Sequence, residues 1–328
     1  MRQRLLSSTV IGPLVALILV VFVVSLTTDR FLLPQNLSNV TLQVSSVAIA
    51  AIGATLVILA GGIDLSPGSV LALSSSTLAI LIKNLGWPVE IAIFATLVLG
   101  ALLGLGNGVL STYLRIPSFV ATLATLTIYR GLAFLITGGT PIFSISPKLR
   151  PIFYGSFLGV PLPFYYVVAA FVLTGLFLRY TVPGRAIYAV GGNESAARFS
   201  GIKVNRTRLL TFMIAGLTAA AAGVLTTARL DSGSPNYGVG LELQAIAAAV
   251  IGGASLAGGL GNIVATLFGA LIVAVVQNGL NLNAVQASWQ QVTLGTIIIL
   301  AVGLDMWRND LSEALRRLFR RPGQKGST

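Results

Sequence analysis

Residues 243–282 read LQAIAAAVIGGASLAGGLGNIVATLFGALIVAVVQNGLNL, and this stretch, which carries no charged side chain, decides the fold class. A helix that crosses the hydrocarbon core of a bilayer needs about 20 mostly apolar residues. The stretch is long enough for two such helices, and the glycines near its middle predict a break between them. We therefore expect an all-α integral membrane protein.

The composition of the whole chain leads to the same class. Of 328 residues, 55% are hydrophobic and 9% are charged, and the mean hydropathy is +0.89. An average soluble protein has about 25% charged residues. So few charged side chains cannot cover a water-facing surface of this size, so the bilayer must be the main solvent.

Apolar segments of suitable length recur along the chain and predict a bundle of about ten transmembrane helices. We expect one membrane domain over residues 1–308, followed by a basic tail over 309–328. The apolar run after the N-terminal MRQR is long and lacks a cleavage signal, so we interpret it as a retained first helix. The ten predicted spans are 10–28, 39–61, 67–83, 89–113, 118–137, 162–178, 208–228, 242–257, 261–281 and 290–307.

The distribution of basic residues predicts the orientation. Short cytoplasmic loops are enriched in Lys and Arg. Ten spans that start inside place both termini and the polar loop 180–207 in the cytoplasm, together with about fifteen of the 21 Lys and Arg. This topology explains the net charge of +12 better than a nucleic-acid ligand does. The basic residues left on the outer side are Arg30, Lys83, Lys148, Arg150 and Arg229.

Missing residue types exclude several kinds of chemistry. The chain has no Cys and no His, which excludes disulfides, thiol nucleophiles, His bases and most zinc sites. It also lacks the G-x-x-x-x-G-K-[ST] pattern of a phosphate-binding loop, so any ATP must bind to another chain. We expect no catalytic residues, no metal site and no cofactor bound by this chain.

The segment GGIDLSPGSV, residues 61–70, lies between the second and third predicted spans. Its glycines are suited to end one helix, and Ser66 before Pro67 is a favourable start for the next. One interpretation is a capped helical hairpin in which Asp64 assists the cap. The other is a broken helix whose polar groups, Asp64 and Ser66, face a path for a transported solute. The residues alone leave both interpretations open.

A stripe of hydroxyl groups marks the predicted span 118–137. Ser118, Thr122, Thr125 and Tyr129 follow one another at spacings of four, three and four residues, which places them on one helix face. These hydroxyls can bond to their own helix backbone, or they can line a path for a neutral, hydroxylated solute. We favour the path. For Arg130, we expect its side chain to extend to the outer interface.

The polar segment YAVGGNESAARFSGIKVNR, residues 188–206, predicts a short helix in the cytoplasmic loop. The glycines at 191–192 predict a turn, and Asn193 is a suitable N-cap. Glu194 places negative charge in the first turn, and Gly201 can end the helix. Such a helix is either an inert part of the loop or an element that docks a cytoplasmic partner. We favour docking, since ordered loops often carry function.

Small residues and amides complete the pattern. Glycine or alanine recurs every fourth position at 100–108 and 215–223, which predicts close helix packing. The stretch GGASLAGGLG at 252–261 echoes GGIDLSPGSV and suggests duplicated halves. Further along, amide side chains occur without charge, and Asn278 is a further candidate for the solute path.

Taken in order, these motifs resemble those of the permease subunits of bacterial ABC sugar importers of the ribose type. The resemblance covers nearly the whole chain, and the four pieces are specific only in combination. They are GGIDLSPGSVLAL at 61–73, PSFVATLATLTIYRGLAFLITGG at 117–139, YAVGGNESAARFSGIKVNR at 188–206, and AIAAAVIGGASLAGGLGNIVATLFGALI at 245–272 followed by QNGLNL.

The resemblance implies a multi-pass protein of the bacterial inner membrane, working as two copies or beside a related permease. Two cytoplasmic ATPase subunits would bind ATP and Mg, and an extracytoplasmic binding protein would deliver sugar. The family's coupling element maps onto residues 191–202. The positions on that motif are Gly191, Gly192, Asn193, Glu194, Ala196, Ala197, Arg198, Gly201 and Ile202.

We therefore expect import of a monosaccharide, a ribose-like pentose or a hexose, by alternating access. One alternative is an ABC permease for a nucleoside, an amino acid or another small solute. A second is an ion-coupled secondary transporter, which would need ionisable groups in mid-membrane. A membrane enzyme fits least. Our candidates for the translocation path are Asp64, Ser66, Ser118, Thr122, Thr125, Tyr129 and Asn278.

Overall fold

The computed structural model describes residues 8–319, and the side chains of residues 10–303 except Tyr154. The described part is almost entirely helical, with four two-residue strands. Its elements are α1 (Ser8–Thr27), α2 (Pro34–Leu59), α3 (Pro67–Ala79), the π-helical turn η1 (Ile80–Asn84), α4 (Val89–Thr112), α5 (Ser118–Thr137), β1 (Ile142–Phe143), α6 (Leu149–Tyr154), β2 (Ser156–Phe157), β3 (Val160–Pro161), α7 (Leu162–Tyr180), α8 (Val182–Gly192), α9 (Glu194–Phe199), α10 (Val204–Leu230), β4 (Ser232–Gly233), α11 (Leu241–Ile251), α12 (Ile263–Leu282) and α13 (Ala287–Phe319).

Every one of the ten predicted spans coincides with a helix. Within residues 8–319, seven helices are long and apolar enough to cross a membrane, namely α1, α2, α4, α5, α7, α10 and α12. The other three segments correspond to α3 with η1, α11, and the apolar part of α13. The eighth predicted span is too long, because α11 ends at Ile251 and the glycine-rich residues that follow are not helical.

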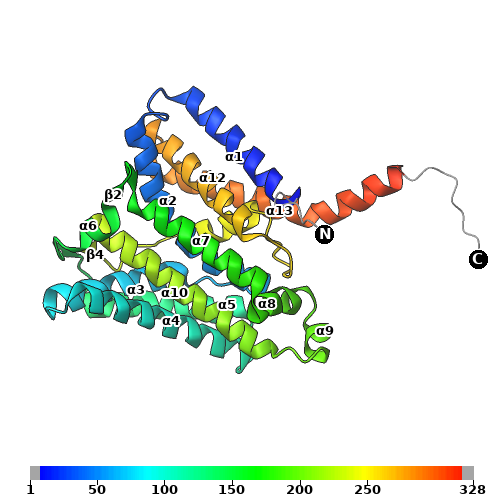
Figure 1. Ribbon diagram of the computed structural model, residues 1–328, viewed down its shortest axis with the longest axis horizontal. Helices are drawn as coiled ribbons and strands as arrows, with labels where there is room; N and C mark the ends of the chain where they lie inside the picture. The colour runs from blue at the N-terminus through cyan, green and yellow to red at the C-terminus, as the bar shows by residue number, and fades with distance from the viewer. Residues whose placement is uncertain (1–7, 320–328) are drawn as a thin grey trace, which may run out of the picture.

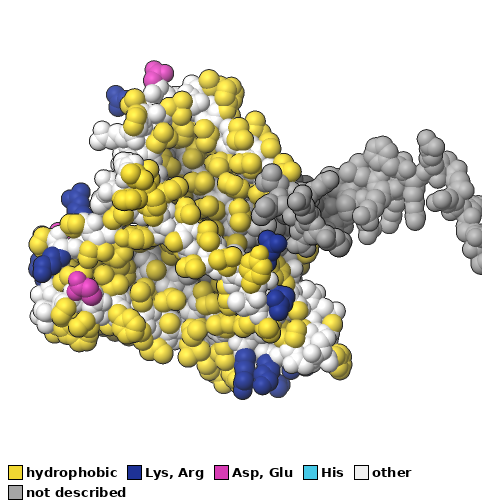
Figure 2. Space-filling model, in the orientation of Figure 1, with side chains coloured by type: hydrophobic (Ala, Val, Ile, Leu, Met, Phe, Trp, Pro, Cys, Tyr) yellow, Lys and Arg dark blue, Asp and Glu magenta, His cyan; other side chains and the backbone are white. Residues whose placement is uncertain are grey.

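The loops separate to opposite ends of the bundle (Figure 1). In that view α6, β2 and β4 lie at the left, which we call the strand end, and α8 and α9 lie at the right, which we call the α9 end. The start of α1 also lies toward the α9 end. Figure 2 shows apolar side chains over the middle of the visible face and Lys and Arg side chains near its two ends, as expected of a protein that spans a bilayer.

The helix α2 forms the centre of the bundle. Every residue from Val47 to Leu59 is buried, on all sides of the helix. A helix that is apolar all round belongs inside a bundle rather than at its surface. The largest apolar core cluster joins α2, from Val44 onward, to residues of α7, α8, α10, α11 and α12, so neighbours from distant parts of the sequence surround this part of α2.

The predicted small-residue packing is confirmed between α4 and α10. A Cβ atom at Gly104 would lie 2.1 Å from the carbonyl oxygen of Phe212, and one at Gly216 would lie 2.1 Å from that of Gly100. Only glycine allows the two backbones to approach this closely.

The two long loops at the strand end pair with each other, which the sequence did not indicate. The strands β1 and β4 are antiparallel, with Ile142 opposite Gly233. Asp231 supports this pairing, since its Oδ1 accepts a hydrogen bond from the backbone N–H of Ile145 at 3.0 Å. Near the C-terminus, α13 continues to Phe319 and so enters the predicted basic tail. Residues 320–328 of that tail lie outside the described residues.

Candidate functional site: the coupling element and the helix breaks

The predicted cytoplasmic segment contains two helices, α8 and α9, joined by Asn193 alone. Asn193 is the predicted N-cap, because its Oδ1 accepts a hydrogen bond from the N–H of Ala196 at 2.9 Å. The helix α9 ends at Phe199, and Gly201 adopts a φ of +81° just beyond it. This left-handed conformation is the helix-ending role predicted for Gly201. Ile202 then returns its N–H to the carbonyl of Ala197 at 3.0 Å.

Glu194 fastens α9 to the start of α10. Its two carboxylate oxygens each accept a hydrogen bond at 2.8 Å, one from Arg198 and one from Arg208. The pKa of the Glu194 carboxyl lies below its ordinary value, first because Arg198 donates this hydrogen bond and then because Arg208 brings a positive charge close. Both ion pairs are partly exposed, so they orient α9 more than they stabilise the fold.

The two faces of α9 differ sharply. Ala197 is 4% exposed and packs with Val190 of α8 and Val204 of α10. On the opposite side, Phe199 is 92% exposed. Single exposed apolar side chains are common on protein surfaces, so a role of Phe199 in binding a partner stays a proposal. Sequence reasoning missed Phe199, although it is the sole large apolar residue in ESAARF and Ala197 supplies the buried face.

The turn predicted at Gly191 and Gly192 is wrong, because both residues belong to the last turn of α8. The physical reason for glycine here is space rather than backbone conformation. A Cβ atom at Gly191 would lie 1.8 Å from the carbonyl oxygen of Leu59. The loop 180–207 therefore begins as a helix that packs directly on the end of α2.

The segment between α2 and α3 contains a buried polar network. Asp64 is 3% exposed, and its Oδ1 accepts hydrogen bonds from the N–H of Ser66 at 2.8 Å and from its hydroxyl at 2.7 Å. Asn107 of α4 donates to the Ser66 hydroxyl at 2.8 Å, and the Tyr129 hydroxyl donates to Asn107 at 3.3 Å. Ser66 precedes α3 as predicted, but its hydroxyl serves Asp64 instead of capping the helix.

Hydroxyl groups of α5 hold the backbone of the same segment. The Ser118 hydroxyl accepts from the N–H of Ile63 at 3.0 Å, and the Thr122 hydroxyl accepts from the N–H of Leu65 at 3.0 Å. Thr122 and Thr125 also donate to carbonyls of their own helix, to Ser118 at 2.8 Å and to Thr122 at 3.2 Å respectively, as the alternative interpretation of the stripe expects. The predicted stripe therefore faces the interior, where most of it supports the break between α2 and α3.

The structure thus brings together Asp64, Ser66, Ser118, Thr122 and Tyr129, with Thr125 beside them on α5. Their contact with a solute stays a prediction. Asn107, which joins Ser66 to Tyr129, was missed because it lies in the glycine-rich run of α4, which indicated only helix packing. An amide in an otherwise apolar span was the available signal.

Asn278 lies apart from this network. Its amide exchanges two hydrogen bonds with Asn36, at 2.9 and 3.0 Å, and both side chains are buried between α2 and α12. This pairing is a structural role, and a role in the solute path stays a prediction.

Arg130 reaches the loop after β4 at the strand end, and its extension to the outer interface stays a prediction. Its guanidinium donates hydrogen bonds to the carbonyls of Pro235 at 2.6 Å and Tyr237 at 2.5 Å, which ties α5 to the loop after β4. Glu242, at the start of α11, lies next to Gly68 at the start of α3. Charged groups therefore also connect α3, α5 and α11 toward the strand end.

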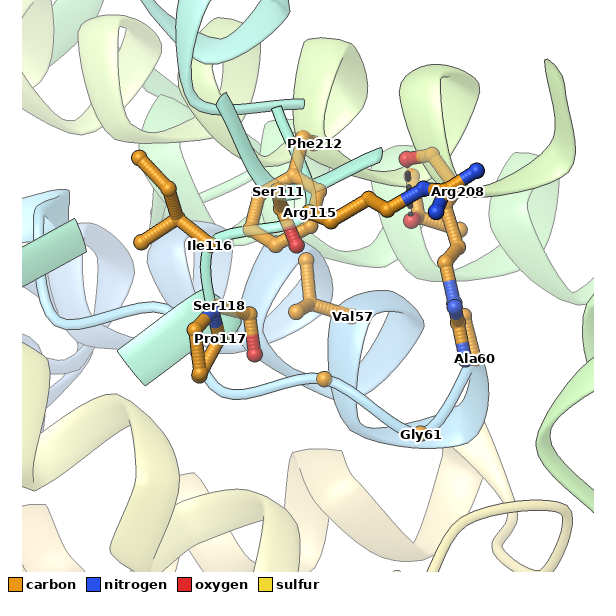
Figure 3. Close-up of a pocket in the computed structure, with 12 residues that line it drawn as sticks. Val57, Ala60, Gly61, Ser111, Arg115, Ile116, Pro117, Ser118, Arg208 and Phe212 are labelled. Carbon is orange, nitrogen blue, oxygen red and sulfur yellow. Dashed lines mark hydrogen bonds between the residues drawn. The ribbon is translucent and has the colours of Figure 1, made fainter. Parts of the chain in front are cut away.

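A cavity of about 290 Å³ opens at the α9 end, between the end of α2, the turn before α5 and the start of α10. Figure 3 shows the long side chains of Arg115 and Arg208 on one side of it and Ile116 and Pro117 on the other. Ser118 contributes to its wall, so the cavity adjoins the segment that carries Asp64. Its size is close to the lower limit for sites that bind small molecules.

Comparison with known proteins places this architecture among membrane permeases. Residues 36–302 match the family described as "Branched-chain amino acid transport system / permease component". The ribose import permease protein RbsC of Bacillus subtilis (strain 168) is 45% identical over 297 residues, which cover 90% of this chain and 92% of that protein. No solved structure matches the chain.

Two further relatives extend the comparison. The ribose import permease protein RbsC of Escherichia coli (strain K12) is 42% identical, with 89% of this chain and 92% of that protein covered. The xylose transport system permease protein XylH of the same strain is 36% identical, with 88% and 90% covered. The resemblance predicted from the four motifs is therefore confirmed. The chain belongs to the permease family described as "Branched-chain amino acid transport system / permease component", and ribose and xylose permeases are among its relatives.

Proposed function

We propose that this chain is the transmembrane permease subunit of an ABC importer that moves a monosaccharide, a pentose in the first instance, into the cytoplasm. The observation that carries the proposal is the 45% identity to a ribose import permease over 90% of the chain. An alignment of this extent spans the α2–α3 linker, the α11–α12 linker and the α8–α9 segment. The hydroxyl and amide groups around Ser66, Asn107 and Thr122 suit an uncharged, hydroxylated solute.

The proposed topology has ten membrane crossings, with both termini and the α9 end in the cytoplasm. Three of these crossings would be made by α3 with η1, by α11 together with part of the linker that follows it, and by the apolar part of α13. The strand end would then face outward, and its paired loops would receive an extracytoplasmic sugar-binding protein. A second permease copy or a related permease would complete the membrane part.

The proposed coupling element is α9. Two cytoplasmic ATPase subunits would bind ATP and Mg, and Phe199 would insert into an apolar pocket on one of them. Three features favour this role. The helix is capped by Asn193, it is oriented by the two ion pairs of Glu194, and its one large apolar side chain points away from the chain. A short helix built in this way presents its exposed face with little loss of entropy on binding.

The proposed mechanism is alternating access. Nucleotide-driven movement of the partner ATPases would shift α9 and, through it, the helices on either side of the Asp64 segment. Such a shift needs only that the partners bind the two states with different affinity. The cavity lined by Arg115, Arg208 and Ser118 would be the cytoplasmic exit.

A branched-chain amino acid is the second candidate solute, because the matching family carries that description. It would bring a carboxylate and an ammonium group to the path. One competition assay distinguishes the two candidate solutes. An excess of unlabelled pentose should block uptake of the labelled sugar, and an excess of leucine should not.

The experiment expresses the chain with the ATPase and binding protein encoded beside it, in cells that lack their own ribose and xylose uptake. Uptake of labelled ribose or xylose supports the proposal. Two variants test α9: Glu194→Lys places a cation beside Arg198 and Arg208, and Gly201→Pro is incompatible with a φ of +81°. Both should insert normally and lose uptake. If the wild-type transporter takes up neither labelled ribose nor labelled xylose, the sugar assignment is refuted. If both variants take up sugar as fast as the wild type does, the role of α9 is refuted.

A further inference from the structure

The helices α8 and α9 form a short, stiff connection from the α9 end into the bundle. Asn193 ends α8 and caps α9, so no flexible linker separates the two helices. Inside the bundle, Ile187 of α8 is fully buried in the largest core cluster. The Tyr188 hydroxyl donates a hydrogen bond at 3.1 Å to the carbonyl of Gly261, in the linker between α11 and α12.

The C-terminal end of α8 meets two linkers at a junction made of backbone alone. The N–H of Gly259, in the α11–α12 linker, donates to the carbonyl of Leu59, at the end of α2, at 3.0 Å. A Cβ atom at Gly191 would lie 1.8 Å from this same carbonyl oxygen and 2.6 Å from the Gly259 nitrogen. One at Gly258 would lie 2.8 Å from the Gly191 oxygen and 2.9 Å from the Cα of Gly61.

Glycine is required at this junction on two separate grounds. Gly61, Gly258 and Gly259 have φ values of +78°, +89° and +70°, a region that residues with a side chain rarely adopt. Gly191 has an ordinary helical conformation, so space alone demands glycine there. Contacts between backbones have no side-chain rotamers that can absorb a displacement, and close-packed interiors transmit strain.

The two linkers at the junction lead directly to the starts of two membrane helices. Residues 60–66 carry the Asp64 network and precede α3, while residues 252–262 end at Asn262, whose side chain caps α12. These are the two segments whose sequences echo each other, and the structure places them in contact at Gly61 and Gly258. The junction with α8 is therefore connected directly to the starts of both α3 and α12.

We propose that Gly191 is a positioning residue for energy coupling, and that the junction of Leu59, Gly61, Gly191, Gly258 and Gly259 transmits movement of α9 to both linkers. The inference rests on the proposed function of α9 as the element that meets the ATPase. It assigns to Gly191 a contact with backbone inside the bundle rather than a contact with the partner. The movement it transmits would open or close the segment that carries Asp64.

The test compares two glycine-to-alanine substitutions within helices. Gly191→Ala brings a Cβ atom to 1.8 Å from the Leu59 oxygen, whereas a Cβ atom at Gly131, on α5, would meet no atom within 4 Å, so Gly131→Ala is the control. The complete transporter, reconstituted in vesicles, carries Leu260→Cys as a probe of the α11–α12 linker. Leu260 is 56% exposed and this chain has no cysteine, so label found on the permease chain, once it is separated from its partners, reports this position alone.

In the otherwise wild-type transporter and in Gly131→Ala, ATP should change the rate at which the cysteine at position 260 is labelled. In Gly191→Ala this change, and the solute moved per ATP hydrolysed, should fall by roughly 5- to 150-fold, the usual range of a coupling between sites. ATP hydrolysis itself should continue. An ATP response in Gly191→Ala equal to that in Gly131→Ala, or no ATP response in the transporter that carries neither substitution, would overturn the inference.

A second variant covers failure of Gly191→Ala to fold. Tyr188→Phe removes only the hydroxyl that bonds to Gly261, and Tyr180→Phe, on the exposed end of α7, is its control. Tyr188→Phe should weaken the ATP response at position 260 while its control does not, and equal responses would count against the junction. The labelling needs no particular solute, so an ATP response without pentose uptake would refute the sugar proposal and leave the junction intact.

Discussion

The Asn36–Asn278 pair separates a packing role from a role in the solute path. The two buried amides exchange hydrogen bonds at 2.9 and 3.0 Å between α2 and α12. Asn278→Leu removes both bonds and leaves the Asn36 oxygen without its donor in an apolar interface. The double variant Asn36→Leu, Asn278→Leu replaces the pair by two apolar side chains and leaves neither amide behind.

The expected magnitudes follow from this geometry. Leaving one buried polar group unpaired costs about 1–3 kcal/mol, whereas exchanging both partners for apolar groups is close to neutral. Hydrogen bonds between membrane helices average about 0.6 kcal/mol each, so two bonds imply a coupling of about 1 kcal/mol. Asn278→Leu should therefore be clearly less stable than the wild type. The double variant should recover part of the loss, because Asn36→Leu also removes the hydrogen bond from Asn36 to the carbonyl of Phe31 at 2.9 Å.

The assay is a double-mutant cycle of thermal unfolding in detergent, run beside pentose uptake in cells. With a packing role, stability and uptake fall together in Asn278→Leu and recover together in the double variant. A double variant that is stable but does not transport would place Asn278 on the solute path and refute the packing interpretation. Additive losses in stability would show that the two amides do not interact.

Three further predictions test other parts of the structure. Gly104→Ala forces a Cβ atom to 2.1 Å from the carbonyl oxygen of Phe212 in α10 and should cost about 1–3 kcal/mol of stability. Gly106→Ala is the control, because its Cβ atom meets only the Tyr129 hydroxyl at 3.5 Å. The yield of folded protein in detergent compares the two variants, and equal yields would contradict the close packing of α4 on α10. Phe199→Ala, at a side chain that is 92% exposed, should leave the melting temperature unchanged and abolish uptake, so unimpaired uptake would argue against docking through this residue. The pKa of the Glu194 carboxyl is lowered in the folded protein, so its ion pairs stabilise α9 above the ordinary pKa of 4.5 and are lost as the pH falls through the lower pKa of the folded state. The order of α9, measured with a spin label on Ser195→Cys, should stay constant from pH 8 to pH 6 and decrease only under stronger acid. A decrease near pH 7 would show that the ion pairs are not formed.

The sequence was sufficient for features that depend on local chemistry. Apolar length located all ten helical segments, and glycine spacing indicated the close packing of α4 on α10. Capping preferences located both ends of α9, since Asn193 and Gly201 act through atoms within three residues of themselves.

The features that escaped sequence reasoning depend on distant contacts. Gly191 signalled a turn by its local preference, while its actual constraint comes from Leu59, more than a hundred residues away in the chain. The same holds for the pairing of Asn278 with Asn36 and for the bond from Asn107 to Ser66. Residue type marks such positions as unusual, but only the packed structure identifies their partners.

The cytoplasmic position of α9 is the claim on which coupling to an ATPase depends, and single-cysteine labelling measures it directly. Ser195→Cys introduces the only thiol into a chain without cysteine, at an exposed position of α9. A membrane-impermeant maleimide should label it in inside-out vesicles and fail to label it in intact cells. Labelling in intact cells would place α9 outside and contradict the importer mechanism.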